Sequence, residues 1–201
     1  METDDREIAD ARDRDDMARL ASGYDAALND LMARHAPRLF NYLLRQLQSE
    51  GDAEDAAQEA FVRVFQHRSS FDPQHRFTTW LYTIATNLAR SRQRHRARHP
   101  AISLETSGDP ADGELKDRVP SGQPGPAEQM EATERAATVR RAVAQLPDEL
   151  REPLILAEYE DLSHQEIGEI LSCSAKAVEM RVYRARQQLR KELASLLSES
   201  A

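Results

Sequence analysis

The sequence of 201 residues is poor in cysteine and in aromatic residues, and it contains no long run of apolar side chains. The single cysteine, Cys173, excludes a disulfide within the chain and any zinc or iron–sulfur site that needs several cysteines of one chain. No stretch is apolar for long enough to cross a bilayer, and residues 1–16 are acidic and polar, unlike a secretory signal. We therefore expect a cytoplasmic protein with no direct membrane insertion.

Metal and cofactor sites also find no support in the sequence. His95 and His99 have the spacing of the two zinc ligands on a zinc-protease helix, but Arg96 stands where that motif has its glutamate. We interpret the histidines as polar surface residues or as residues that face nucleic acid. The sequence thus predicts no metal site.

Helical periodicity dominates the remaining pattern. Charged residues make up 31% of the chain, which is typical of soluble helical proteins with many surface ion pairs. Apolar residues recur at helical spacing through 17–47, 56–88 and 139–189, while Asp72 and Pro73 mark a loop. The length allows one medium domain or two small ones, and the pattern fits two better, so we predict an all-α fold of two small helical domains joined by a flexible linker.

Composition divides the chain into four parts. The first is dense in Asp and Arg without apolar period, and the third holds five of the nine prolines and four of the seven glycines. The predicted parts are an acidic disordered tail at 1–14, a first domain at 15–99, a flexible acidic linker at 100–134 and a second domain at 135–197.

Charge segregation gives the clearest functional signal. The chain has a net charge of −8, yet no acidic residue lies between Pro73 and Leu104. Aromatic residues near its start can stack on unpaired bases while its arginines hold phosphates, a combination that suits a single strand or a melted duplex. Trp80 lies on the apolar stripe and is expected in the core. The better stacking candidates are Phe71 and Tyr82, with Thr79 and Asn87 placed to bond base edges, and the phosphate candidates are Arg90, Arg92, Arg94, Arg96 and Arg98.

An acidic helix precedes this segment. We expect Asp52 to be its N-cap and Asp55, Gln58 and Glu59 to face away from its apolar side. Such a face is ordinarily just solvated. Its position beside an arginine-rich helix indicates a division of labour, in which the acidic side meets a basic protein surface.

The second domain ends in a predicted helix-turn-helix. Ser163 and Glu166 have the spacing of a capping box that opens a helix through Leu171, and Cys173 with Ser174 makes a short turn. The next helix is basic on one side and apolar on the other. Two helices joined in this way are typical of a reader of the DNA major groove.

Three segments in this order resemble the ECF sigma factors of bacterial RNA polymerase, over about residues 15–193. AEDAAQEAFVRVFQ (53–66) is similar to region 2.2 of that family, FTTWLYTIATNLARSRQR (77–94) to regions 2.3 and 2.4, and 146–190 to region 4. The resemblance implies a protein that binds core RNA polymerase, through its β′ and β subunits, recognises promoter DNA, and is held inactive by an anti-sigma factor. It also implies that the chain is not an enzyme and has no catalytic residue and no cofactor of its own.

The resemblance also assigns roles to residues. Polymerase binding falls to Asp55, Gln58, Glu59 and Phe61. Recognition and melting of the −10 element falls to Phe71, Thr79, Tyr82, Asn87, Arg90, Arg92 and Arg94. Recognition of the −35 element falls to Ser174, Lys176, Glu179, Met180, Arg181, Arg184 and Arg186.

The sequence departs from the family pattern in a few places. Ser91 stands where the family usually has Asp, and Gly168 replaces a frequent Ala, which we expect to loosen its helix slightly. Glu179 occupies a position where a basic residue is frequent. A carboxylate there would accept a hydrogen bond from cytosine N4 rather than bind phosphate, which predicts an unusual −35 sequence.

Two other classes of protein fit parts of the chain. A stand-alone helix-turn-helix regulator accounts for residues 161–189 but not for the first domain, and it would bind duplex DNA without polymerase. An anti-sigma or scaffold protein accounts for the amphipathic helices but gives no reason for two basic patches. Salt-sensitive binding to nucleic acid would count against that class.

Overall fold

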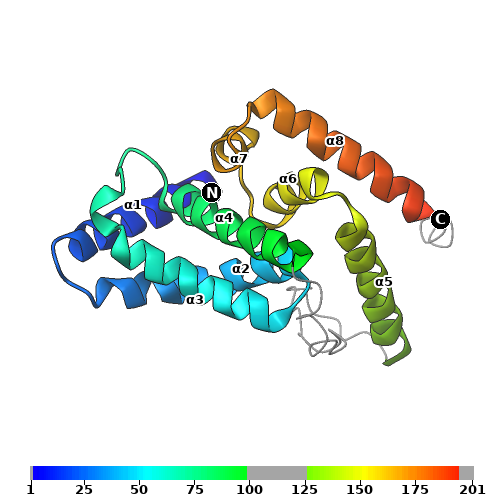
Figure 1. Cartoon of the computed structure of the whole chain (residues 1–201), viewed down its shortest axis with the longest axis horizontal. Helices are drawn as coiled ribbons and strands as arrows, with labels where there is room; N and C mark the ends of the chain where they lie inside the picture. The colour runs from blue at the N-terminus through cyan, green and yellow to red at the C-terminus, as the bar shows by residue number, and fades with distance from the viewer. Residues whose placement is uncertain (1, 99–125, 195–201) are drawn as a thin grey trace.

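The computed structural model describes residues 2–98 and 126–194, with side chains from residues 6 and 133 onward in these two ranges. All regular structure within them is helical, which confirms the predicted all-α fold. The helices form two modules, α1–α4 and α5–α8 (Figure 1). Residues 99–125, which contain most of the predicted linker, lie outside the described residues.

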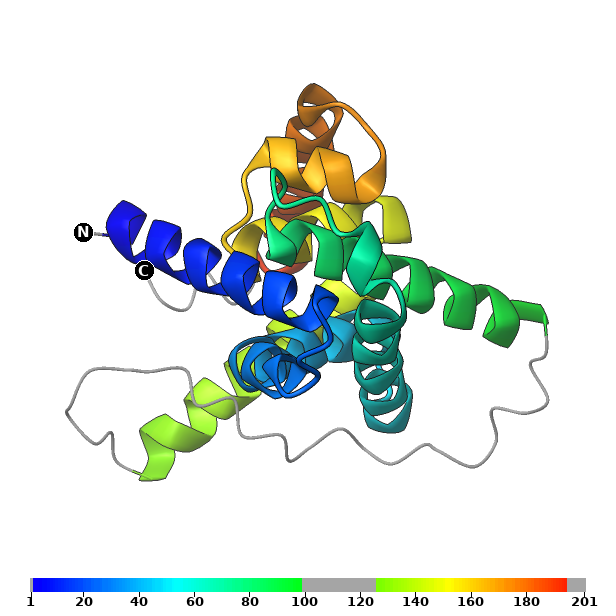
Figure 2. The same cartoon turned by 90° about the vertical axis from the view of Figure 1, so that its left-hand side faces the viewer.

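The first module comprises α1 (Glu2–Ala21), α2 (Ala27–Leu47), α3 (Glu50–Gln66), the short 3-10 helix η1 (Arg68–Ser70) and α4 (Phe77–Arg98). Its core lies between α2, α3 and α4, where Leu31, Leu43 and Leu81 are fully buried. Tyr42 in α2 and Thr86 in α4 share a buried hydrogen bond of 2.7 Å between their hydroxyl groups. The basic end of α4 extends beyond this bundle (Figure 2).

The N-terminal segment corrects one prediction. Residues 1–14 were expected to be a disordered tail, but α1 is helical from Glu2. Asp13, 1% exposed, accepts a hydrogen bond from Arg34 Nε of α2 at 3.0 Å and lies 2.9 Å from His35 Nε2. Asp16 accepts from the same guanidinium at 2.6 Å. Buried ion pairs to α2, together with the buried side chains of Met17 and Leu20, therefore hold α1 in place.

The ends of the helices follow local chemistry. Gly23 has φ +96°, a left-handed conformation that suits glycine, and it lies in the break after α1. The N-cap of α3 is Ser49, whose hydroxyl accepts a hydrogen bond from the Asp52 backbone N–H, so the prediction of Asp52 as N-cap is wrong. Asp52 instead lies in the first turn, where a negative charge is favourable.

The second module comprises α5 (Pro126–Gln145), α6 (Asp148–Tyr159), α7 (His164–Leu171) and α8 (Ala175–Glu192). Helix α5 begins within the predicted linker of 100–134, which is a second correction. Proline is favoured in the first turn of a helix, and the Ala, Glu and Gln residues that follow are strong helix formers. The core of the module includes Leu146, Ile155, Leu156 and Ile167.

The predicted helix-turn-helix is present as α7 and α8. Both hydrogen bonds of the Ser163–Glu166 capping box are formed, as the sequence predicted. Gly168 lies under the turn, because a Cβ added there would be 2.6 Å from the backbone carbonyl oxygen of Cys173. Gly168 thus allows the backbone of the turn to pass close to α7. We interpret this close approach, rather than a loosened helix, as the role of the glycine.

Candidate functional site

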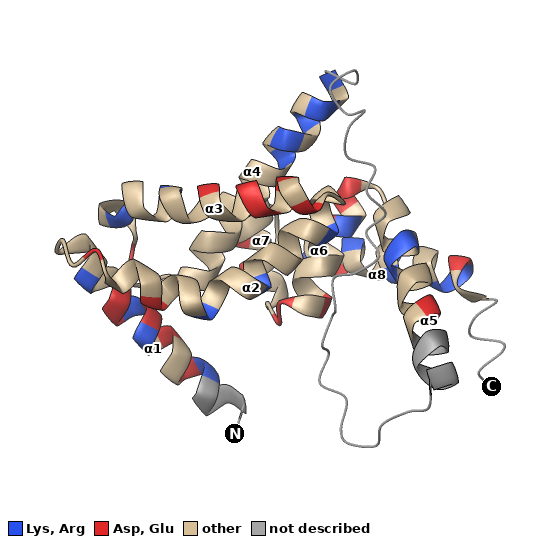
Figure 3. Ribbon diagram, turned by 90° about the horizontal axis from the view of Figure 1, so that it is seen from below, with Lys and Arg blue, Asp and Glu red and all other residues tan. Residues whose placement is uncertain are grey.

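The outer face of α3 presents a row of accessible side chains. Asp55 and Gln58 are exposed, and Glu59 beside them is partly exposed. Phe61, for which the resemblance implies a polymerase contact, is only 3% exposed and packs in the core, so its side chain does not lie on this face. Val62, 47% exposed and one helical turn beyond Gln58 and Glu59, lies there instead. Acidic positions along α3 are visible in Figure 3.

Helix α4 has one side turned toward the second module. Tyr82 is 4% exposed, and its hydroxyl donates a hydrogen bond to the Glu160 carboxylate at the end of α6. Arg90 donates two hydrogen bonds to Glu152 of α6, from Nε at 2.9 Å and from Nη2 at 2.6 Å. Thr79 is also buried. The sequence-based placement of Tyr82 as an accessible side chain off the apolar stripe is therefore wrong in this arrangement.

The other side of α4 is open. Asn87 and Arg94 are exposed, and Arg92 is partly exposed. Trp80, expected in the core, is only partly buried, and its ring lies 5.3 Å from that of Phe71 between centroids. Lysine and arginine residues colour the free end of α4 in Figure 3. An aromatic pair followed by accessible amide and guanidinium groups can stack on bases and hold phosphates.

Two carboxylates at the junction of the modules have shifted pKa values. Burial raises the pKa of Glu160 to about 7, against the opposing effects of Tyr82 and Arg38. The pKa of Glu166 is lowered to about 2, because hydrogen bonds from Ser163 and Arg76 outweigh its partial burial. Ionised Glu166 is thus favoured at the junction, whereas ionised Glu160 is disfavoured there.

Helix α8 presents the second candidate surface. The side chains predicted to face the −35 element are mostly exposed: Lys176, Glu179, Met180, Arg184 and Arg186. The Lys176 ammonium lies 2.9 Å from the Glu179 carboxylate. Tyr183, which sequence reasoning did not single out, is 57% exposed one turn beyond Glu179 and Met180. A tyrosine ring combines an apolar face with a polar hydroxyl, and this was the sequence feature that could have pointed to Tyr183 as a contact residue.

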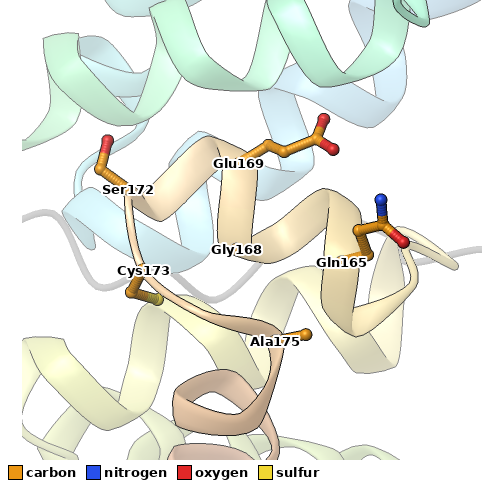
Figure 4. A pocket seen from close by; sticks show the side chains of 6 residues that line it. All are labelled: Gln165, Gly168, Glu169, Ser172, Cys173 and Ala175. Carbon is orange, nitrogen blue, oxygen red and sulfur yellow. The ribbon is translucent and has the colours of Figure 1, made fainter.

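Three of the −35 candidates also make contacts within region 4. The Ser174 hydroxyl is the N-cap acceptor for the Ala177 N–H, at 3.2 Å. Arg181 is partly buried, with Nη1 3.7 Å from Cys173 Sγ. Arg186 pairs with Glu158 of α6 at 2.5 Å. Figure 4 shows the open hollow around the turn, where Gly168 presents no side chain to Cys173 and Ala175.

Within residues 2–98 and 126–194, no group of three or more His, Cys, Asp or Glu side chains could hold a metal ion. None of the helices in the same ranges is both long enough and apolar enough to cross a membrane.

Comparison with known proteins identifies both modules. Family models described as Sigma-70 region 2 and Sigma-70, region 4 match residues 31–99 and 136–189. The RNA polymerase sigma-H factor of Pseudomonas aeruginosa is 32% identical over 96% of this chain and 100% of its own length. The ECF RNA polymerase sigma factor SigW of Bacillus subtilis is 33% identical over 87% of this chain and 92% of its own. The chain belongs to the ECF sigma factors.

Solved structures agree on the fold. CnrH, solved in complex with the cytosolic domain of CnrY, superposes with a TM-score of 0.65 at 27% identity, covering 94% of this chain and 99% of CnrH. The sigma factor RpoE of Bartonella quintana, solved with the anti-sigma factor NepR, has a TM-score of 0.64 at 22% identity, covering 84% and 98%. Helices α2–α4 thus form sigma region 2, and the end of α5 with α6–α8 forms region 4. A stand-alone regulator does not account for the region 2 match.

Proposed function

We propose that this ECF sigma factor docks on core RNA polymerase through the outer face of α3. The face combines Asp55, Gln58 and Glu59 with the exposed apolar side chain of Val62. An acidic ridge around an apolar centre suits a basic helical surface, such as the coiled coil of the β′ subunit that the family resemblance implies. The protein itself carries out no reaction in this proposal. It acts in the cytoplasm, where polymerase and promoters are found.

The open side of α4 is proposed to capture the melted −10 strand. Asn87 can bond base edges, Arg92 and Arg94 can hold phosphates, and Phe71 with Trp80 offers aromatic surface. Extruding a base costs a few kcal/mol, which stacking and hydrogen bonding in a preformed site can offset. No nucleotide hydrolysis is needed for this step.

Region 4 is proposed to read the −35 element with the exposed side of α8. In a helix-turn-helix the N-terminal residues of the second helix reach the base edges, which selects Lys176, Glu179 and Met180, and Tyr183 lies exposed one turn further along. Glu179 would favour cytosine through its N4 amino group, and Met180 would favour the methyl group of thymine. Arg184 lies further along the same helix and suits a phosphate contact.

An anti-sigma factor is proposed as a further partner. The relative CnrH was solved bound to the cytosolic domain of another protein, and its likeness extends over nearly the whole of this chain. We propose that a protein of this kind controls the present chain by covering its polymerase-binding and promoter-binding faces.

The observation that carries the proposal is the presence of both sigma regions in the family order within one chain. Transcription from fragmented genomic DNA by core polymerase, with and without this chain, tests it directly. We expect start sites that depend on the chain and share −10 and −35 sequences. Failure to produce any such start site, with a polymerase shown to be active, would overturn the proposal.

A further inference from the structure

Helix α1 carries three aspartates at a spacing that places them on one side of the helix. Asp10, Asp13 and Asp16 recur at every third residue, and residues three apart are neighbours on a helix surface. Helix α1 packs against α2, η1 and the start of α4 (Figure 1). The family model of region 2 matches only from residue 31 onward, so the three aspartates precede the matched part of the chain.

One set of contacts joins Asp13 to His35 of α2. Asp13 is 1% exposed, and both of its carboxylate oxygens lie 2.9 Å from His35 Nε2. An ionised carboxylate only accepts hydrogen bonds, so Nε2 is the donor and the orientation of the imidazole ring is fixed. Arg34 Nε donates to the same carboxylate at 3.0 Å, which offsets the cost of burying its charge.

The ring of His35 packs against an aromatic cluster. Its centroid lies 5.1 Å from that of Phe77, the first residue of α4, which is 1% exposed. Phe77 in turn lies 6.2 Å from Phe71 and 6.3 Å from Trp80 between ring centroids. Aromatic rings attract each other at these separations. Because Phe71 and Trp80 form the aromatic pair of the proposed −10 site, the placement of this pair depends on a surface that His35 supports.

A second set of contacts joins α1 to the loop between η1 and α4. Arg76, the last residue before α4, donates to both oxygens of Asp10, from Nε at 2.6 Å and from Nη2 at 2.8 Å. Two parallel hydrogen bonds fix the orientation of a guanidinium as well as its position. Nη1 of the same side chain pairs with Glu166 of α7. The loop thus begins at Phe71 in the aromatic cluster and ends at a residue that α1 holds.

We infer that α1 supports the −10 site, and that His35, held by Asp13, is a positioning residue for the Phe71–Trp80 pair. The inference rests on the proposed capture of the −10 strand by the open side of α4. His35 acts through Phe77, since its side chain is 15% exposed and its Nε2 is engaged by Asp13. A site whose rings are already in place spends less free energy on ordering when it binds. Loss of the support should therefore weaken the binding of single strands.

Trp80 is the single tryptophan of the chain, so its fluorescence reports on the site directly. In the unchanged full chain we expect the time-resolved anisotropy of Trp80 to follow the tumbling of the protein, without fast local motion of the ring. His35→Gln keeps an amide N–H that can donate to Asp13 but removes the ring that packs on Phe77. We expect this variant to add a fast local decay and to shift the Trp80 emission to longer wavelength. A fast decay already present in the unchanged chain would overturn the inference.

Binding of a fluorescein-labelled random pool of short single-stranded DNA is measured on the same proteins by anisotropy. We expect His35→Gln to bind about tenfold more weakly than the unchanged chain, which is the effect of losing one base–aromatic stack. Asp13→Asn keeps the size of the side chain but weakens its hold on His35, and both readouts should change in the same direction. This second variant provides the test if His35→Gln does not fold.

A matched control separates positioning from a general loss of stability. Tyr42→Phe also removes a buried hydrogen bond between helices of this module, the 2.7 Å bond to Thr86, and the Tyr42 ring packs on Tyr82 rather than on the cluster around Trp80. We expect the control to melt earlier than the unchanged chain while keeping its Trp80 signal and its affinity for the DNA pool.

Test variants that keep the Trp80 signal and the DNA affinity of the control would overturn the inference. This outcome is distinguishable from failure of the proposed −10 site. If Trp80 is rigid but the unchanged chain does not bind the pool, the −10 site itself is contradicted, and with it the inference that rests on it.

Discussion

Phe61 and Val62 are chain neighbours on α3 whose side chains lie on opposite sides of the helix. Phe61 is 3% exposed in the core of region 2, and Val62 is 47% exposed on the proposed polymerase-binding face. Phe61→Ala deletes a buried aromatic ring, which costs about 3–5 kcal/mol of unfolding free energy. Since about 1 kcal/mol shifts the melting temperature of a protein of this size by roughly 2–4 °C, we expect a fall of about 10 °C. Val62→Ala removes exposed surface only and should change stability by less than about 0.5 kcal/mol.

Thermal unfolding by circular dichroism and co-purification with core polymerase together separate the two roles. We expect Phe61→Ala to melt early, and Val62→Ala to melt like the unchanged protein while binding polymerase more weakly. The reasoning is refuted if Phe61→Ala melts normally yet loses polymerase binding, because Phe61 would then belong to the docking face. It is also refuted if Val62→Ala binds as tightly as the unchanged protein.

Three further predictions concern region 4 and its junction with region 2. Gly168→Ala places a Cβ 2.6 Å from the Cys173 carbonyl oxygen, and the expected strain of about 1–3 kcal/mol exceeds the gain in helix propensity of about 1 kcal/mol. Thermal unfolding should show a lower melting temperature; a higher one would contradict the close approach. Ser163→Ala removes the cap of α7 and should cost about 1 kcal/mol in urea unfolding, whereas no loss would mean that the cap is dispensable. Burial raises the pKa of Glu160 from an ordinary 4.5 to about 7, so the docked form holds this proton more tightly than the separated form. Docking should therefore be strongest near pH 4.5, where Glu166 is still ionised, and weaken as the pH rises to about 7. The separation of the modules can be followed by double electron–electron resonance between spin labels at Ser69→Cys in η1 and Lys191→Cys in α8, in a Cys173→Ser background. Distances between these labels that stay constant across this pH range would contradict the predicted pH dependence.

Features set by neighbouring residues could be predicted from the sequence. The Ser163–Glu166 capping box and the break at Gly23 are of this kind, because their hydrogen bonds and dihedral angles involve only nearby residues. The two-module organisation was also predictable, since helical periodicity repeats on either side of a segment rich in proline and glycine.

Features set by distant contacts could not be predicted in the same way. The helix at residues 2–14 depends on pairs such as Asp13 with Arg34, which only the fold brings together. Tyr82 is covered because region 4 docks on α4, and nothing near Tyr82 in the sequence indicates that. Phe61 shares its helix face with buried Ala57 and Val64, so the apolar periodicity did contain the signal for the core.

The central claim is that α3 holds this sigma factor on core RNA polymerase. The most direct measurement compares co-purification of core polymerase with the unchanged chain, with an Asp55/Gln58/Glu59 triple-alanine variant, and with an Asp15→Ala/Asp25→Ala control that removes as many charges from other exposed positions. We predict that the unchanged chain and the control retain polymerase and that the triple variant loses it while melting normally. Equal retention by all three proteins would contradict the assigned docking face, and retention by none would contradict the sigma function itself.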